Sequence, residues 1–265
     1  MKYSAEKFDP TSRRSPDYEL PLSERMRTFL RIEFLYQQYN YFMNIDTDWS
    51  SRSSIACLLE MMSILSRGDI RSDVHKELDR HISILTSYHS QPAVDAKILE
   101  KMVINLSNRR DNLRSAGTNF MQPLRDNEFL SAIRHRSTIP GGTCEFDLPE
   151  FGHWLRQNHN RRSQDLQIWL DMVEPVCTAV IELLWLIRES TEPSEKSAVN
   201  GMYQHKMPPY SHDQLVRVKM EEGSHLFPEI SGNQHRFTVR FLEWCDINQR
   251  AIQTHDDVLF NISIC

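Results

Sequence analysis

The sequence predicts an α+β fold, in which a mainly α-helical domain over residues 18–196 packs against an antiparallel β-strand domain over residues 197–265. Three observations support this class. Apolar residues recur at helical spacing from residue 21 to residue 187, the pattern changes to alternation near residue 197, and a Pro-Gly-Gly break at Pro140 interrupts the helical region. The two patterns differ because side chains repeat about every 3.6 residues along a helix and about every two along a strand.

The helical region begins at Pro21, and proline is favoured in the first turn of a helix. Four helices follow, each predicted by apolar residues three or four positions apart, and Gly68 ends the second of them. Their apolar faces are Leu22, Met26, Phe29, Leu30, Phe34 and Leu35; Ile55, Leu58, Leu59, Met62 and Leu65; Ile70, Val74, Leu78, Ile82 and Leu85; and Val94, Ile98, Met102 and Leu106.

Shorter helices are predicted at about 125–136 and 148–158, and residues 166–187 close the series. Pro175 is expected to divide this last segment into two helices, because proline lacks the backbone N–H and clashes with the preceding turn. The second half of the segment is apolar on nearly every side, which indicates a buried central helix.

The break at residues 139–149 is the most unusual stretch of the helical region. Gly141 and Gly142 lie between Pro140 and Pro149, so helix cannot continue there. Residues 143–146 alternate polar and apolar side chains and predict a short strand. We expect this strand, together with residues 18–20, to join the β domain, so that the break ties the two domains together.

Alternation identifies the β domain. Val216, Val218 and Met220 share one face, Phe237, Val239 and Phe241 repeat the pattern, and Val258, Phe260, Ile262 and Ile264 repeat it again. Glycine-containing turns at residues 222–224 and 231–233 separate these segments. About five antiparallel strands are expected, too few to shield both faces of a sheet without further elements.

Composition bounds the function. The 265 residues carry 40% apolar and 25% charged side chains, a formal net charge of −5 and a pI near 6.1, which disfavour a general polyanion binder. No apolar run reaches the roughly 18–20 residues of a membrane helix. The polar residues 1–17 are expected to form a flexible extension and not a secretory signal, and five scattered cysteines suit a cytoplasmic protein.

Motifs for catalysis are absent from the sequence, which predicts a non-enzyme without metal or cofactor. An active site dispersed along the chain would leave no such motif and is the alternative. There is no His-Glu-x-x-His, phosphate-binding glycine loop or nucleophile elbow. Asp46 and Asp48 resemble a metal-binding Asp-x-Asp, but a helix-capping turn is the more common role of such a segment.

Arginines are the remaining candidates for a binding site, since guanidinium groups pair with carboxylates in a two-pronged geometry. Arg27 and Arg31 are four residues apart on the first helix, and Arg134 and Arg136 end the helix before the Pro-Gly-Gly break. Further clusters are Arg125; Arg109, Arg110 and Arg114; and Arg236 with Arg240 on one strand face. Most such clusters are solvated faces or local salt bridges.

Several co-linear blocks resemble the ZapD family of FtsZ-associated cell-division proteins. The first is PLSERMRTFLRIEFL at residues 21–35. The others are RGDIR and KELDR at 67–71 and 76–80, STIPGG and FDLP at 137–142 and 146–149, NGMYQ at 200–204, FPEISG at 227–232, and RF and VRF at 236–237 and 239–241. The resemblance covers about residues 18–265 and is weak in the fourth helix and at 193–198.

The resemblance implies a symmetric homodimer of α-helical and β-strand domains, without catalytic group or cofactor. It also implies the function: binding the acidic and apolar C-terminal tail of FtsZ and bundling its filaments during Z-ring assembly at the mid-cell septum. Four leading candidates for the tail-binding site are Arg27, Arg31, Arg134 and Arg136, and the weaker ones are Arg25, Arg125 and His153.

Two other classes of function remain open from the sequence alone. A small-molecule enzyme would need a pocket that one sequence cannot reveal. A nucleic-acid-binding adaptor would use the same arginines and bind DNA or RNA in the absence of FtsZ. Neither accounts for the co-linear blocks, and no nucleic-acid or membrane partner is expected.

Overall fold

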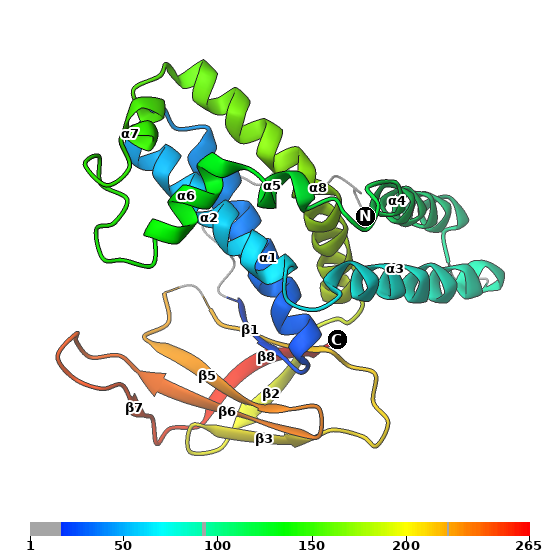
Figure 1. Cartoon of the computed structure of the whole chain (residues 1–265). Coiled ribbons are helices and arrows are strands. Elements are labelled where there is room, and N and C mark those ends of the chain that lie inside the picture. Colours follow the sequence, from blue (N-terminus) through cyan, green and yellow to red (C-terminus); the bar gives the residue numbers. More distant parts are fainter. Residues whose placement is uncertain (1–16, 92–93, 222) are drawn as a thin grey trace. The chain divides into compact units, whose positions relative to one another are not determined.

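The computed structural model describes residues 17–91, 94–221 and 223–265, which form two compact units (Figure 1). One unit, here called the β unit, comprises the described residues up to Leu30 and those from Leu184 to Cys265. The other, the helical unit, comprises Arg31–Leu183. Of the predicted N-terminal extension 1–17, residues 1–16 lie outside the described part, whereas Asp17 already belongs to a strand.

The β unit consists of two antiparallel sheets. The first sheet has the strand order β1-β4-β8-β2, and the second has the order β3-β6-β5, with β7 paired to the end of β6. The strands are β1 (Asp17–Pro21), β2 (Ser194–Ala198), β3 (Met202–Lys206), β4 (Leu215–Lys219), β5 (Leu226–Asn233), β6 (Arg236–Glu243), β7 (Ile252–Gln253) and β8 (Val258–Ile264). The α+β class is therefore confirmed, as is the strand predicted at residues 18–20.

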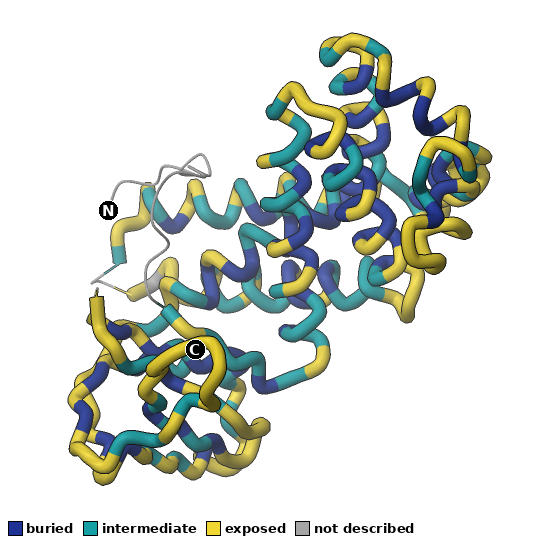
Figure 2. The backbone as a smooth tube through the Cα atoms, turned by 90° about the vertical axis from the view of Figure 1, so that its left-hand side faces the viewer, coloured by how far each residue is buried: buried dark blue, intermediate teal, exposed yellow. Residues whose placement is uncertain are grey.

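Apolar side chains from both sheets form one core. Val216 and Val218 of β4 and Phe260 of β8 meet Phe237 and Phe241 of β6. The rings of Phe241 and Phe260 lie 4.9 Å apart between centroids. The alternation in the sequence thus marks the inner faces of two sheets that pack against each other. Each sheet shields the apolar face of the other from solvent, which a single small sheet could not do. Along β6, buried positions alternate with partly or fully exposed ones. Figure 2 gives the degree of burial along the whole backbone.

Eight α-helices are described. They are α1 (Glu24–Met43), α2 (Asp48–Leu65), α3 (Ile70–Ser87), α4 (Ala96–Ser115), α5 (Gln122–Arg125), α6 (Glu128–Arg136), α7 (Pro149–Leu155) and α8 (His159–Glu189), with a 3₁₀ turn η1 (Tyr88–Ser90) after α3. Side-chain caps fix where several begin: Thr47, Asp69, Asp95 and Asn127 accept hydrogen bonds from the free amides of the first turn.

The segment around Thr47 is a helix-capping turn, as expected. Its two carboxylates also hold Arg162 of α8, whose side chain is only 4% exposed. Arg162 Nη2 donates to Asp46 Oδ1 at 2.8 Å, and Nη1 donates to Asp48 Oδ1 and to Ser51 Oγ, each at 3.1 Å. The Asp-x-Asp motif therefore binds a guanidinium group.

Pro175 does not divide the last helix, so that prediction was wrong. α8 is continuous from His159 to Glu189 with Pro175 inside it. Proline removes one helical hydrogen bond but does not prevent the flanking turns from forming, and burial of the apolar surface on both sides of it keeps the helix intact.

The prediction of a strand at residues 143–146 was also wrong. The segment forms turns between α6 and α7, within the helical unit. Its backbone groups are satisfied locally, with Gly142 N donating to Ile139 O at 2.9 Å and Cys144 N to Gly141 O at 3.1 Å. Arg52 Nη1 donates to Thr143 O at 2.8 Å. Since these groups already have partners, the segment is no strand that could tie two domains together.

An ionic network fixes β1 in the first sheet. Arg188, at the end of α8, donates through Nε to Glu19 Oε1 at 2.8 Å and through Nη2 to Glu19 Oε2 at 2.9 Å. Arg217 of β4 lies 3.2 Å from the same carboxylate, donates to Asp17 at 2.7 Å and donates to the carbonyl of Arg188 at 3.1 Å. Glu19 therefore links β1, β4 and the end of α8.

Replacing Glu19 by alanine should destabilise the protein by about 1–3 kcal/mol, because two arginines that are about a fifth exposed lose their shared carboxylate. Urea unfolding followed by circular dichroism would measure the loss. The matched control is Glu24→Ala, which removes an ion pair to Arg27 from a carboxylate that is 84% exposed and should cost less than about 1 kcal/mol. Equal losses in the two variants would contradict the role of the network.

Candidate functional site: a cationic hollow on the second sheet

A hollow of about 1000 Å³ lies on the second sheet, where β3, β5 and β6 run side by side. We call it the cationic hollow. Its lining residues come from the end of β3, the β5–β6 hairpin and the start of β6: Gln204, His205, Lys206, Ser231, Gly232, Asn233, His235, Arg236, Phe237 and Thr238. None of these ten residues carries a carboxylate.

Strand register places two cations directly opposite each other in this hollow. Lys206 of β3 pairs with Arg236 of β6, and opposite residues in an antiparallel pair have Cβ atoms about 4.5–5.5 Å apart. Both residues are exposed, and neither forms an ion pair within residues 17–91, 94–221 and 223–265. Like charges in this position destabilise a sheet. The arrangement therefore favours an anion that would neutralise both.

The next arginine along β6 differs. Arg240 points to the same face but forms an ion pair with Glu229, its neighbour across the β5–β6 ladder. Two repeats of the alternating pattern, or four residues, thus separate the arginine that has an ion pair from the one that has none. The charge of the hollow is concentrated at the hairpin end of the sheet.

Tight backbone packing shapes the hollow. Gly232 has φ +156°, and a Cβ placed there would lie 2.4 Å from Arg236 O and 2.5 Å from Phe237 Cα. Asn233 Oδ1 accepts hydrogen bonds from the backbone amides of His235, at 2.9 Å, and Arg236, at 3.3 Å, and these bonds close the hairpin. Phe237 is buried beneath this surface. Arg236 therefore lies on a closely packed hairpin, with Lys206 opposite it on β3.

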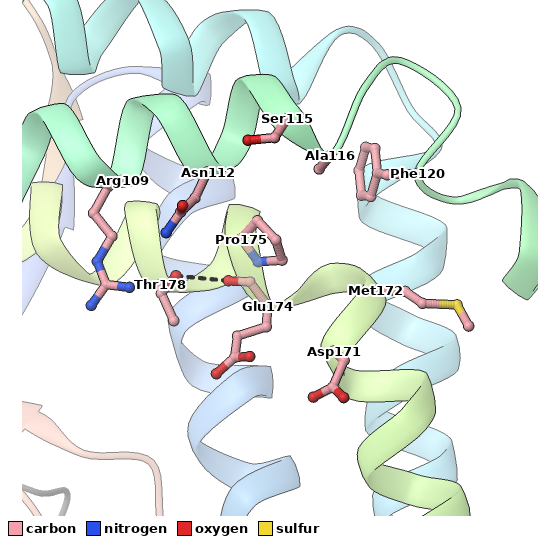
Figure 3. Close-up of a pocket in the computed structure, with 10 residues that line it drawn as sticks. All are labelled: Arg109, Asn112, Ser115, Ala116, Phe120, Asp171, Met172, Glu174, Pro175 and Thr178. Atoms are coloured by element: carbon pink, nitrogen blue, oxygen red, sulfur yellow. Dashed lines mark hydrogen bonds between the residues drawn. The ribbon is translucent and has the colours of Figure 1, made fainter.

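A second hollow, of about 640 Å³, lies within the helical unit between α4 and α8 (Figure 3). Arg109 and Asn112 line it from α4, and Asp171, Glu174 and Pro175 line it from α8. The acidic side chains offset the arginine. Burial and, to a smaller extent, the Glu174 carboxylate raise the pKa of the neighbouring Tyr36 to about 12. This hollow is a poor receptor for an acidic ligand.

A third hollow, of about 160 Å³, lies around the turn after α2 and contains Arg125, one of the residues predicted from the sequence. Arg125 donates to Ser66 Oγ at 3.3 Å, and Asp69 lies in the same lining. The guanidinium group thus has a local structural partner.

The predicted residues on the first helix have different surroundings. Arg25 donates to the side chain of Gln214 at 3.3 Å, and Arg27 forms an exposed ion pair with Glu24 at 3.1 Å. Arg31 is exposed. Of these three, Arg31 has the side chain most available to a ligand.

The other predicted residues lie on α6 and α7. Arg134 is exposed, Arg136 lies 3.6 Å from Asp147, and His153 contacts Gln157 at 3.1 Å. The seven residues do not share one hollow, since only Arg125 lines any of the three hollows given above. Lys206 was missed entirely, although the pairing of β3 with β6 would have identified it.

In residues 17–91, 94–221 and 223–265, no three His, Cys, Asp or Glu side chains gather in a way that could hold a metal ion. Over the same part of the chain, no helix has the length and apolar character needed to cross a membrane.

The fold and the hollow define an α+β protein with a surface suited to an anionic partner. Comparison with known proteins gives the family: a family model described as cell division protein ZapD matches residues 30–240. Proteins called cell division protein ZapD are similar over 94% of this chain: 34% identity in Methylococcus capsulatus (97% of that protein), 33% in Janthinobacterium sp. and 34% in Chromobacterium violaceum (98% of each). The chain belongs to the ZapD family of non-catalytic cell-division proteins.

Replacing Gly232 by alanine should destabilise the β unit by at least about 2 kcal/mol, because the new Cβ would overlap backbone atoms of β6 that cannot move independently. Gly223→Ala is the matched control: its φ is +81°, but nothing lies within 4 Å of the added atom, so about 1 kcal/mol is expected. Thermal unfolding of both variants would test the difference. A Gly232→Ala protein as stable as the control would contradict the close approach.

Proposed function

We propose that this protein binds the C-terminal tail of FtsZ and cross-links FtsZ filaments into bundles, promoting Z-ring assembly and septum formation. Membership of the ZapD family supports the role in division, and the cationic hollow supports the mode of binding. The single observation that carries the proposal of a site is the opposition of Lys206 and Arg236 without a carboxylate in the lining.

Electrostatics favour the cationic hollow as the receptor for an acidic tail. The whole chain carries a formal net charge of −5, so its overall charge does not attract an acidic segment. A local pair of cations therefore selects where such a segment binds. Arginine can accept a carboxylate through two parallel hydrogen bonds, and lysine adds a compact charge beside it.

Bundling requires more than one site per particle. In our proposal two copies of the chain form a symmetric homodimer that presents two hollows to filaments displaying many tails. Each contact can then be weak, with Kd on the order of micromolar, because a bound partner raises the effective concentration for the second contact. The protein would act in the cytoplasm and be recruited to the mid-cell septum.

The residues predicted from the sequence are further candidate contacts for the same tail. Arg31 and Arg134 are the strongest of them, since both are exposed and neither forms an ion pair in the part of the chain that the structure describes. Arg25, Arg27, Arg125, Arg136 and His153 each have a structural partner. They would have to exchange that partner for the tail.

Co-sedimentation with GTP-assembled FtsZ tests the function itself. The protein should pellet with filaments of full-length FtsZ and bundle them, and it should stay in the supernatant with FtsZ that lacks its C-terminal tail. Electron microscopy of the same samples would report bundling. Equal bundling of the two forms of FtsZ would refute tail binding.

Charge reversal tests the site. The double variant Lys206→Glu, Arg236→Glu should weaken binding of a fluorescent FtsZ tail peptide by about 30-fold or more, because two attractive pairs become repulsive, at a cost of about 2 kcal/mol or more. The matched control is Lys97→Glu, Lys101→Glu on α4, which changes the net charge equally at exposed positions outside all three hollows. Fluorescence anisotropy would measure both.

Two further experiments distinguish the hollow from the α1 arginines as the binding site, and the FtsZ tail from nucleic acid as the partner. The double variant Arg27→Glu, Arg31→Glu should retain tail binding if the hollow is the site, and its loss would transfer the site to α1. Wild-type binding should weaken as salt rises, since pairs are screened beyond about 10 Å at 0.1 M. Salt-sensitive binding to DNA without binding to the tail would indicate a nucleic-acid adaptor instead.

A further inference from the structure

Tyr210 combines two properties that a purely structural residue rarely has together. It is 97% exposed, the most exposed large apolar side chain of the described residues, and its φ is +62°. Side chains with a Cβ seldom adopt positive φ, and a bulky aromatic residue there is an outlier. The position therefore carries conformational strain without burial in return.

The local turn explains how the strain is held. Ser211 N donates to Pro208 O at 3.2 Å, which closes a four-residue turn. Pro209 occupies the second position, where its fixed φ is favoured, and Tyr210 occupies the third. In a turn with positive φ at the third position, glycine or asparagine is the expected residue. The sequence has tyrosine where the backbone favours glycine.

The turn lies beside the cationic hollow. Lys206 lines the hollow, and the next residue, Met207, donates its amide to the carbonyl of His235 at 2.9 Å; His235 also lines the hollow. Tyr210 follows Lys206 by four residues, which span at most about 14 Å of extended chain. Figure 1 shows the β3–β4 connection leaving the second sheet next to the β5–β6 hairpin. An aromatic ring on this turn is within reach of a ligand in the hollow.

We propose that Tyr210 is a specificity-determining contact that packs against an apolar side chain of the acidic peptide bound in the cationic hollow. This inference rests on the proposed function and adds a second recognition element to the same site. Lys206 and Arg236 would bind the carboxylates of the peptide, and the tyrosine ring would select a peptide with an apolar residue next to them. A rigid aromatic side chain loses little conformational entropy on binding, which suits this role.

The test exploits the strain. Tyr210→Gly removes the ring and also relieves the positive φ, so the thermal midpoint should not fall while affinity for the FtsZ tail peptide should fall about tenfold. Tyr210→Phe should keep both the strain and the affinity. Tyr88→Ala, which removes a 41% exposed tyrosine of the helical unit, is the matched control and should leave peptide affinity unchanged.

Salt and peptide variants distinguish the ring from the cations. The loss caused by Tyr210→Gly should be the same at low and high salt, whereas Lys206→Glu with Arg236→Glu should reverse the salt dependence, because salt screens the new repulsion and strengthens the residual binding. With a peptide whose apolar residues are replaced by serine, the wild type and Tyr210→Gly should bind equally, as a double-mutant cycle requires for a direct contact.

The outcomes separate the two proposals. If Tyr210→Gly binds the tail as tightly as the wild type while the charge-reversal variant does not, the role of Tyr210 is refuted and the function stands. If the loss persists with the serine-substituted peptide, the ring does not contact the apolar residues and the inference is also refuted. Absence of tail binding by the wild type would overturn both.

Discussion

The pairing of β1 with β4 is the constraint on which the β unit depends. Tyr18 faces Val218 across the first sheet, and two hundred residues of chain separate these neighbours. The pairing requires the helical segments to depart after Pro21 and to return through α8, at whose end Arg188 binds Glu19 of the first strand. Closing so long a loop costs chain entropy, which only the burial of both inner faces and the ionic network can offset.

Regular periodicity made most elements predictable, and the errors came where local chemistry opposed it. Alternation predicted β4, β6 and β8 because their inner faces are buried. It could not reveal β2, an edge strand whose residues are mostly exposed, or β5, which contains Pro228 and Gly232. At residues 143–146 alternation suggested a strand, but glycine turns and the Arg52 contact satisfy the backbone locally. Pro175 suggested a break that burial of α8 overrides.

The candidate site was less accessible to sequence reasoning than the fold. The sequence shows that Arg236 and Arg240 share a strand face, but not that Glu229 neutralises the second and not the first. Lys206 lies thirty positions before Arg236 in the chain, and only the register of β3 on β6 brings them together. Conversely, the arginines of α1, α5 and α6 were visible as clusters, and the partners of Arg25, Arg125 and Arg136 were not.

Two unfavourable features coincide at one end of the second sheet: the opposed cations Lys206 and Arg236, and the positive φ of Tyr210 a few residues further on. Contacts within the described residues offset neither the charge repulsion nor the backbone strain, since the cations form no ion pair and the tyrosine is almost fully exposed. A folded chain under selection for stability alone would replace each with little difficulty, for example by glutamate and glycine. In our proposal an acidic, partly apolar ligand offsets both costs at once, because its carboxylates neutralise the cations and its apolar side chain covers the ring. The hairpin end of this sheet is then the place where stability is exchanged for binding.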